Sequence, residues 1–225
     1  MNDKREQKPV DPMAGIHWDL DKSISYSQYL QLDKVLDAQK PLSGQHDEML
    51  FIIIHQASEL WMRLCLHELS ATRAQIRADD LEPAFKMLSR VARIQTQLIQ
   101  SWDVLSTMTP SDYGRFRDSL GQSSGFQSWQ YRLLEFLLGN KEPRLIEVHA
   151  RDKRAYALLK QELATASIYD ESIRLLARRG FDIPAECTER DWTQPYAAHP
   201  AVEAAWLAVY RDSTGQWDLY ELAEK

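Results

Sequence analysis

Two pairs of residues, each spaced by four positions, have the side chains and the spacing to do chemistry. Phe51 and His55 are one helical turn apart, so both would face the same side of a helix. His55 follows Ile52, Ile53 and Ile54, which we expect to be buried. A buried neutral imidazole can accept or donate one specific hydrogen bond to a ligand. A satisfied core histidine is the alternative interpretation, and for this pair alone it is the commoner one.

Tyr113 and Arg117 form the second pair. The planar guanidinium fits a carboxylate with two parallel hydrogen bonds, and a tyrosine beside it adds an aromatic wall with a hydroxyl. The pair could therefore hold the carboxylate of an amino acid. Arg115 and Asp118 are close in sequence, so a solvated face with ordinary salt bridges explains the spacing equally well.

The segment SSGFQS, residues 123–128, is small and rich in hydrogen-bond donors. Its backbone could closely approach a flat ligand, although a plain loop between helices is the default interpretation. No metal site is predicted, because His46-Asp47-Glu48 and His67-Glu68 match neither His-Glu-x-x-His nor Glu-x-x-His. We expect these groups to be helix caps and surface charges.

The distribution of glycine and proline predicts the elements that must position these residues. Neither residue occurs between Gly44 and Pro83, or between Pro83 and Pro110. Such intervals, rich in Leu, Ala, Gln, Glu and Arg, favour long helices. No Asn-Gly or Asp-Gly turn and no sustained alternation of apolar and polar residues indicates strands. The predicted fold is therefore all-α, a single-domain helical bundle.

Local signals place most helix ends. Thr109, Pro110 and Asp112 form a helix start, and Gly139 and Gly180 are expected to end helices in the left-handed conformation. We expect helices at residues 26–38, 48–77, 80–105, 110–120, 128–138, 143–148, 153–163, 169–179, 201–211 and from 217 onward. Asp47 is a plausible cap for the second of these.

Composition limits the domain organisation and the partners. Residues 1–20 are predicted to be a loose polar arm and residues 21–225 one domain. The 27 basic and 33 acidic residues give a net charge of −6 without a block of one sign, which argues against nucleic acid and anionic membranes as partners. Residues 49–54, the most apolar run, are far shorter than the roughly 20 residues of a membrane span, so we expect a cytoplasmic protein. Because this run is apolar nearly all round, it should cross the centre of the protein.

Long stretches of the sequence resemble the bacterial tryptophan 2,3-dioxygenase family. HDEMLFIIIHQASELW, residues 46–61, and SWDVLSTMTPSDYGRFRDSLGQSSGFQSWQYRLLEFLLGN, residues 101–140, resemble its diagnostic segments. YSQYLQLDKVLDAQKPLS, residues 26–43, is similar to its N-terminal region. RDWTQPY, residues 190–196, and WDLYELAE, residues 217–224, are similar with lower specificity. The resemblance covers essentially the whole chain.

The resemblance implies an all-helical homotetramer with a b-type haem. The reaction would insert both atoms of O2 across the indole C2–C3 bond of L-tryptophan, giving N-formyl-L-kynurenine. Carried over by position, Phe51 would pack on the indole ring and His55, the catalytic position, would hydrogen-bond the indole N–H. Arg117 would bind the substrate carboxylate and Tyr113 would line the pocket.

The resemblance also implies further site residues. Ile52, Ile53 and Ile54 would belong to the substrate-binding turn between Phe51 and His55. The residues implied to reach into a neighbouring subunit's site are Tyr26, Tyr29 and Leu30. The residues implied to lie against the haem are Trp102, Ser124 and Gly125.

One part of the family pattern is missing from this sequence. Family members continue through a helix with the iron-ligating histidine and a GTGG loop, so we expect this chain to be C-terminally incomplete. His149 and His199 do not lie in a sequence similar to that helix, and no residue is assigned as the iron ligand. The alternative function is a non-catalytic helical relative that acts as an aromatic-ligand-binding or assembly module.

Overall fold

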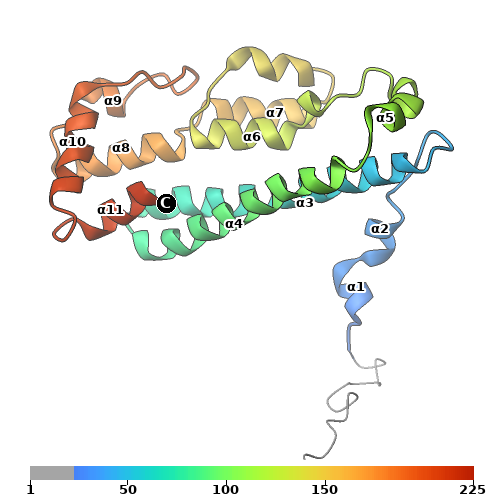
Figure 1. Ribbon diagram of the computed structural model, residues 1–225. Helices are drawn as coiled ribbons and strands as arrows, with labels where there is room; N and C mark the ends of the chain where they lie inside the picture. The colour runs from blue at the N-terminus through green and yellow to red at the C-terminus, as the bar shows by residue number, and fades with distance from the viewer. Residues whose placement is uncertain (1–22) are drawn as a thin grey trace, which may run out of the picture. The chain divides into compact units, whose positions relative to one another are not determined.

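The computed structural model describes residues 23–225, and this part of the chain contains helices and no strands (Figure 1). The all-α prediction is confirmed. The chain divides between Pro41 and Leu42 into two compact units. The arm predicted at residues 1–20 lies outside the described residues.

The first unit contains two short helices where the sequence predicted one. α1 (Tyr26–Leu30) begins with a capping box between Ser25 and Gln28, in which the Gln28 N–H donates to Ser25 Oγ at 3.2 Å. Gln31 then takes up a left-handed conformation, with φ 52°, and α2 (Leu32–Leu36) follows. The prediction of a continuous helix at 26–38 was wrong, because Gln31 ends α1 without the usual glycine.

In the second unit, α3 (Asp47–Ala78) and α4 (Leu81–Leu105) form a long antiparallel hairpin. Asp79 and Asp80 make the connection, with Asp79 in the left-handed region at φ 60°. Such a short connection leaves the two helices as antiparallel neighbours. Side chains from both helices and α6 form one core: Cys65, Leu66, Leu69, Val91, Ile94 and Leu137.

Shorter helices complete this unit. They are α5 (Pro110–Arg117), η1 (Asp118–Leu120), η2 (Gly125–Gln127), α6 (Trp129–Leu138), η3 (Pro143–His149), α7 (Lys153–Leu163), α8 (Ile168–Arg178), α9 (Ala185–Thr188), α10 (Pro200–Arg211) and α11 (Trp217–Glu224). The predicted start at Thr109 and the left-handed glycines Gly139 and Gly180, with φ 105° and 88°, are confirmed. α9 lies between the helices predicted at residues 169–179 and 201–211, where no helix was predicted.

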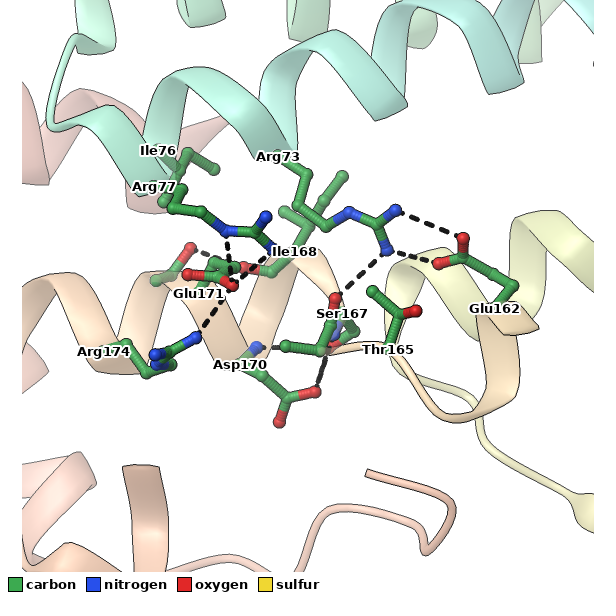
Figure 2. Close-up of polar contacts among 12 residues, drawn as sticks. Arg73, Ile76, Arg77, Glu162, Thr165, Ser167, Ile168, Asp170, Glu171 and Arg174 are labelled. Carbon is green, nitrogen blue, oxygen red and sulfur yellow. Dashed lines mark hydrogen bonds and ion pairs between the residues drawn. The ribbon is translucent and has the colours of Figure 1, made fainter. Parts of the chain in front are cut away.

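Charged side chains join α3 to α7 and α8 (Figure 2). Arg73 forms an ion pair with Glu162, and its Nη1 donates to the Ala166 carbonyl at 3.1 Å. The Arg77 Nε and Nη2 donate to the buried Glu171 Oε1 at 3.0 and 2.8 Å. The hydrogen bonds offset part of the cost of burying the carboxylates, although Glu171 Oε2 has no hydrogen-bond partner among the described residues.

By length and composition, α3 is also the one described helix that could cross a membrane, with a mean hydropathy of 1.3 over its most apolar window. A single such helix is weak evidence, because the long central helix of a water-soluble protein meets the same criteria.

Candidate functional site

Phe51 and His55 share one face of α3, as their spacing predicted. Their ring centroids are 4.1 Å apart, and His55 Nδ1 lies 2.7 Å from the Phe51 carbonyl oxygen. Because a carbonyl oxygen can only accept a hydrogen bond, Nδ1 must carry the hydrogen in the neutral ring. The other ring nitrogen, Nε2, is therefore left as an acceptor for a ligand donor.

The first turns of α3 are more open than the sequence suggested. His55 is exposed, Ile53 is 47% exposed, and Phe51, Ile52 and Ile54 are half-buried. The prediction of a helix start in the centre of the protein was wrong, because the apolar run is only partly covered within this unit. The exposure also removes the interpretation of His55 as a satisfied core histidine.

Aromatic residues of α5 meet Phe51. The Phe51 ring centroid lies 5.8 Å from that of Tyr113 and 5.7 Å from that of Phe116, with the second contact edge to face. Tyr113 and Phe116 are themselves 5.4 Å apart at 87°. Phe116 is fully buried and was not foreseen as a site residue, although its position three after Tyr113 placed it on a neighbouring face of the helix.

Arg117 follows this aromatic cluster on α5. The residue is half-buried, and its Nη1 donates to the Gly121 carbonyl at 2.9 Å. Arg117 has no ion pair with any residue from 23 to 225, whereas the neighbouring Arg115 lies 3.5 Å from Asp112. The ordinary salt bridge that competed with the carboxylate role is therefore formed by Arg115, and Arg117 keeps unused donors.

A capping box fixes the start of α5. The Thr109 N–H and Oγ1 donate to Asp112 Oδ2 at 3.1 and 2.6 Å, and the Asp112 N–H donates to Thr109 Oγ1 at 3.2 Å. The Thr109 hydroxyl, and then the Thr109 N–H, lower the pKa of Asp112 below its ordinary value. Pro110 is preorganised for the first helical position. This start sets the rotation of α5 and so the direction of Tyr113 and Arg117.

The loop after α5 is open to solvent. Ser124 and Gln127 form a capping box around η2, in which the Phe126 N–H donates to Ser124 Oγ at 3.3 Å. Phe126 is 75% exposed, and no heavy atom lies within 4 Å of the position that a Cβ would take at Gly125. Trp102, near the end of α4, is 67% exposed. Within the described residues, no hydrogen bond or ring contact joins Trp102, Ser124 or Gly125 to the Phe51 cluster.

Tyr26, Tyr29 and Leu30 lie on α1 in the first unit, where all three side chains are exposed. Their spacing of three and four places them along one stripe of the helix.

Two acidic residues that were expected to be caps or surface charges are buried. Glu48 accepts from the Leu42 and Ser43 N–H groups at 2.6 and 2.7 Å, and these bonds hold its pKa below its ordinary value, with Leu42 the largest cause. Glu68 pairs with Arg90 at 2.5 Å. α3 begins at Asp47 without a side-chain cap. Across residues 23–225, no three His, Cys, Asp or Glu side chains gather as a metal site.

Fold and site together define a helical protein with an accessible histidine and an aromatic cluster on two helices. The second of these helices also carries an arginine that has no acidic partner among residues 23–225. The chain belongs to the tryptophan 2,3-dioxygenase family, whose model matches residues 13–166. The match covers both helices that carry the site.

Individual relatives are similar over most of the chain. A tryptophan 2,3-dioxygenase of Cupriavidus necator is 57% identical over 211 residues, which are 94% of this chain and 72% of the relative. One of Erythrobacter litoralis is 60% identical over 91% of this chain and 78% of its own length. One of Bacillus thuringiensis is 53% identical over 98% of this chain and 79% of its own length. The relatives are named as dioxygenases, and so as oxidoreductases, with tryptophan as the substrate in the name.

Proposed function

We propose that this chain carries the tryptophan-binding and indole-orienting part of a haem-dependent dioxygenase. The reaction is the insertion of both atoms of O2 across the indole C2–C3 bond of L-tryptophan, giving N-formyl-L-kynurenine. One observation carries the proposal. The aromatic cluster around Phe51 has a hydrogen-bond acceptor, His55 Nε2, on one helix. On the other helix it has Arg117, an arginine without an acidic partner in the described part of the chain.

The proposed role of His55 is to orient the indole. With Nδ1 donating to the Phe51 carbonyl, the acceptor Nε2 matches the single N–H donor of the indole ring. Indole N–H is a very weak acid, so His55 accepts a hydrogen bond and does not remove the proton. Phe51 and the isoleucines Ile52, Ile53 and Ile54 supply the apolar surroundings.

The proposed role of Arg117 is to bind the substrate carboxylate. One guanidinium nitrogen, Nη1, is engaged by Gly121, which leaves the Nε–H and Nη2–H donors for a bidentate pair with a carboxylate. Tyr113 stands four positions before Arg117 on α5 and packs on Phe51, so its proposed role is to line the same space.

We propose haem b as the cofactor, and when bound it supplies the O2 chemistry. The exposed indole of Trp102 could stack on a flat ring, and the backbone at Gly125 is open to a close approach. The described residues offer no iron ligand that we can assign. His149 is buried in η3, and His199 accepts from the Ala201 N–H at 3.2 Å as the cap of α10. Trp102 and Gly125 could therefore contact the ring of the cofactor, whereas none of the described residues is assigned to its iron.

The proposed assembly is a cytoplasmic homotetramer. The exposed stripe of Tyr26, Tyr29 and Leu30 on α1 supports it, because a short amphipathic helix is stable in water only when its apolar stripe is covered. In the tetramer this stripe would enter a neighbouring subunit's substrate site.

Binding calorimetry on the haem-treated 225-residue protein tests the substrate site. The ligands are L-tryptophan and tryptamine, which keeps the indole and amine but lacks the carboxylate. Arg117→Ala should weaken L-tryptophan binding by about ten- to a hundredfold, the loss of a charge-assisted pair, and leave tryptamine unchanged. Arg115→Ala, two positions away on the same helix, should change neither. Equal L-tryptophan affinities of the wild type and Arg117→Ala would overturn the proposal.

The visible absorption spectrum tests the cofactor. A sharp haem band that shifts on addition of L-tryptophan supports haem binding beside the substrate. Only the broad spectrum of free haem would overturn the proposal that the residues of this chain hold the cofactor by themselves.

A further inference from the structure

The carbonyl that engages Arg117 belongs to a residue with an unusual backbone conformation. Gly121 has φ 56° and ψ −124° and follows η1, where its N–H donates to the Asp118 carbonyl at 3.2 Å. Gly121 ends the helical segment formed by α5 and η1. Its carbonyl oxygen lies 2.9 Å from Arg117 Nη1. It is the only hydrogen-bond partner of the Arg117 side chain within residues 23–225.

This backbone conformation is open to glycine and hardly to any other residue. A positive φ with a strongly negative ψ lies outside even the left-handed helical region that asparagine tolerates. No heavy atom lies within 4 Å of the place where a Cβ would stand on Gly121. The restriction therefore comes from the backbone itself and not from crowding by neighbours.

The bond decides which donors of Arg117 remain for a ligand. A guanidinium has five N–H donors in a fixed plane. The bond from Nη1 to Gly121 restricts rotation about the bonds of the Arg117 side chain. The edge of the guanidinium that carries the Nε–H and Nη2–H donors therefore has a fixed orientation. A carboxylate arriving at that edge finds two parallel donors already oriented, so less side-chain entropy is lost on binding.

We propose that Gly121 is a positioning residue of the carboxylate site: its glycine-only conformation aims the carbonyl that holds the Arg117 guanidinium. This inference rests on the proposed function, because it assumes that Arg117 binds the substrate carboxylate. In this proposal Gly121 does not touch the ligand, and it acts by holding the Arg117 side chain that does.

The test is the L-tryptophan and tryptamine affinity of Gly121→Ala, measured beside Arg117→Ala and the double variant. Gly121→Ala should weaken L-tryptophan binding by about two- to tenfold, the range of one net hydrogen bond, and leave tryptamine unchanged. In the double variant, Gly121→Ala should add nothing to the effect of Arg117→Ala, because its effect passes through that side chain.

Gly180→Ala is the matched control for backbone strain. Gly180 also has a positive φ, 88°, and no heavy atom within 4 Å of a Cβ. It follows α8, whose Arg178 bonds the Ile76 carbonyl near the end of α3, whereas α5 packs on the first turns of α3. Gly180→Ala should lower the thermal unfolding temperature as Gly121→Ala does, without changing either affinity.

A measurement on the unmutated protein keeps the inference testable even if Gly121→Ala does not fold. Nitrogen-15 NMR of the Arg117 guanidinium should show Nη1 restricted in rotation before any ligand is added. A freely rotating Nη1 would overturn the inference, and so would a Gly121→Ala variant that weakens both ligands equally or neither. If Arg117→Ala also leaves L-tryptophan binding unchanged, the proposed function fails instead.

Discussion

The ring of Phe51 on α3 lies 5.8 Å from the ring of Tyr113 on α5, centroid to centroid. This contact joins the two residue pairs that the sequence singled out separately. It brings together the helix that carries the proposed indole-orienting group and the helix that carries the proposed carboxylate-binding group. The packing between α3 and α5 therefore decides whether the site exists.

Phe116 is the first test of that packing. Its side chain is fully buried and contacts both Phe51 and Tyr113 edge to face. Phe116→Ala should lower the free energy of unfolding by about 3–5 kcal/mol, because it removes a buried ring and leaves a cavity. Chemical denaturation measures this loss. Phe126→Ala, at a ring that is 75% exposed, should stay within about 0.5 kcal/mol of the wild type, and equal losses at both positions would contradict the packing role.

His55 can be tested by a substrate that lacks the indole N–H. If Nε2 accepts from that N–H, the wild type should prefer L-tryptophan over 1-methyl-L-tryptophan, and His55→Ala should lose most of this preference, about two- to tenfold. The measurement is the ratio of the two affinities, which cancels any general loss of folded protein. A preference that survives His55→Ala unchanged would show that another group recognises the indole nitrogen.

The sequence predicted helix ends well where residues within a single turn determine them. Two examples are the start of α5 at Thr109, Pro110 and Asp112, and the end of α6 at the left-handed Gly139. The end of α1 at Gln31 was not predicted, because its left-handed conformation comes without glycine or asparagine. No residue with a strong preference for ending a helix therefore marks the break between α1 and α2.

The sequence predicted which residues belong to the candidate site but not how they contact one another. Helical spacing placed Phe51 with His55 and Tyr113 with Arg117, since positions four apart share a face. It could not show that these pairs meet, that Phe116 lies beneath them, or that Gly121 holds Arg117. Those contacts depend on how α5 packs and on where the chain turns, which are properties of the tertiary structure.

The sequence also did not predict which charged side chains are buried. Lys141 is almost fully buried, and its Nζ donates to the carbonyls of Glu162, Leu163 and Thr165 at 2.8, 3.1 and 2.8 Å. Burial lowers the pKa of Lys141 to about 8, yet the ammonium group can serve all three acceptors with its three hydrogens. The lysine thus satisfies carbonyls at the end of α7.

Lys141→Met should therefore destabilise the protein, by about 2–4 kcal/mol, because it leaves buried carbonyl groups without donors. Lys160→Met, at an exposed lysine of the same helix end, is the control and should cost less than about 0.5 kcal/mol. Urea denaturation of the two variants beside the wild type measures the difference. Similar midpoints for both would show that water takes the place of the Lys141 donors.

His149 gives the protein a predicted sensitivity to acid. It is buried in η3, and its Nε2 has no hydrogen-bond partner among the described residues. Burial first, and then the positive charge of Arg132, lower its pKa from the ordinary 6.5, and Asp152 opposes them. The unfolded chain therefore takes up a proton as the pH falls through about 6.5, while the folded chain does so only at lower pH.

The sign follows from this difference in protonation. Between 6.5 and the lower pKa of the folded state, the unfolded chain binds more protons, so the stability of the fold decreases as the pH decreases. The free energy of unfolding, measured at about pH 7.5 and about pH 5.5, should fall more for the wild type than for His149→Gln, which has no proton to gain at this position. An equal fall in both proteins would mean that His149 is protonated as easily in the folded chain as in the unfolded one. Such a result would indicate that η3 moves away from α6 and exposes His149 to water in the folded chain.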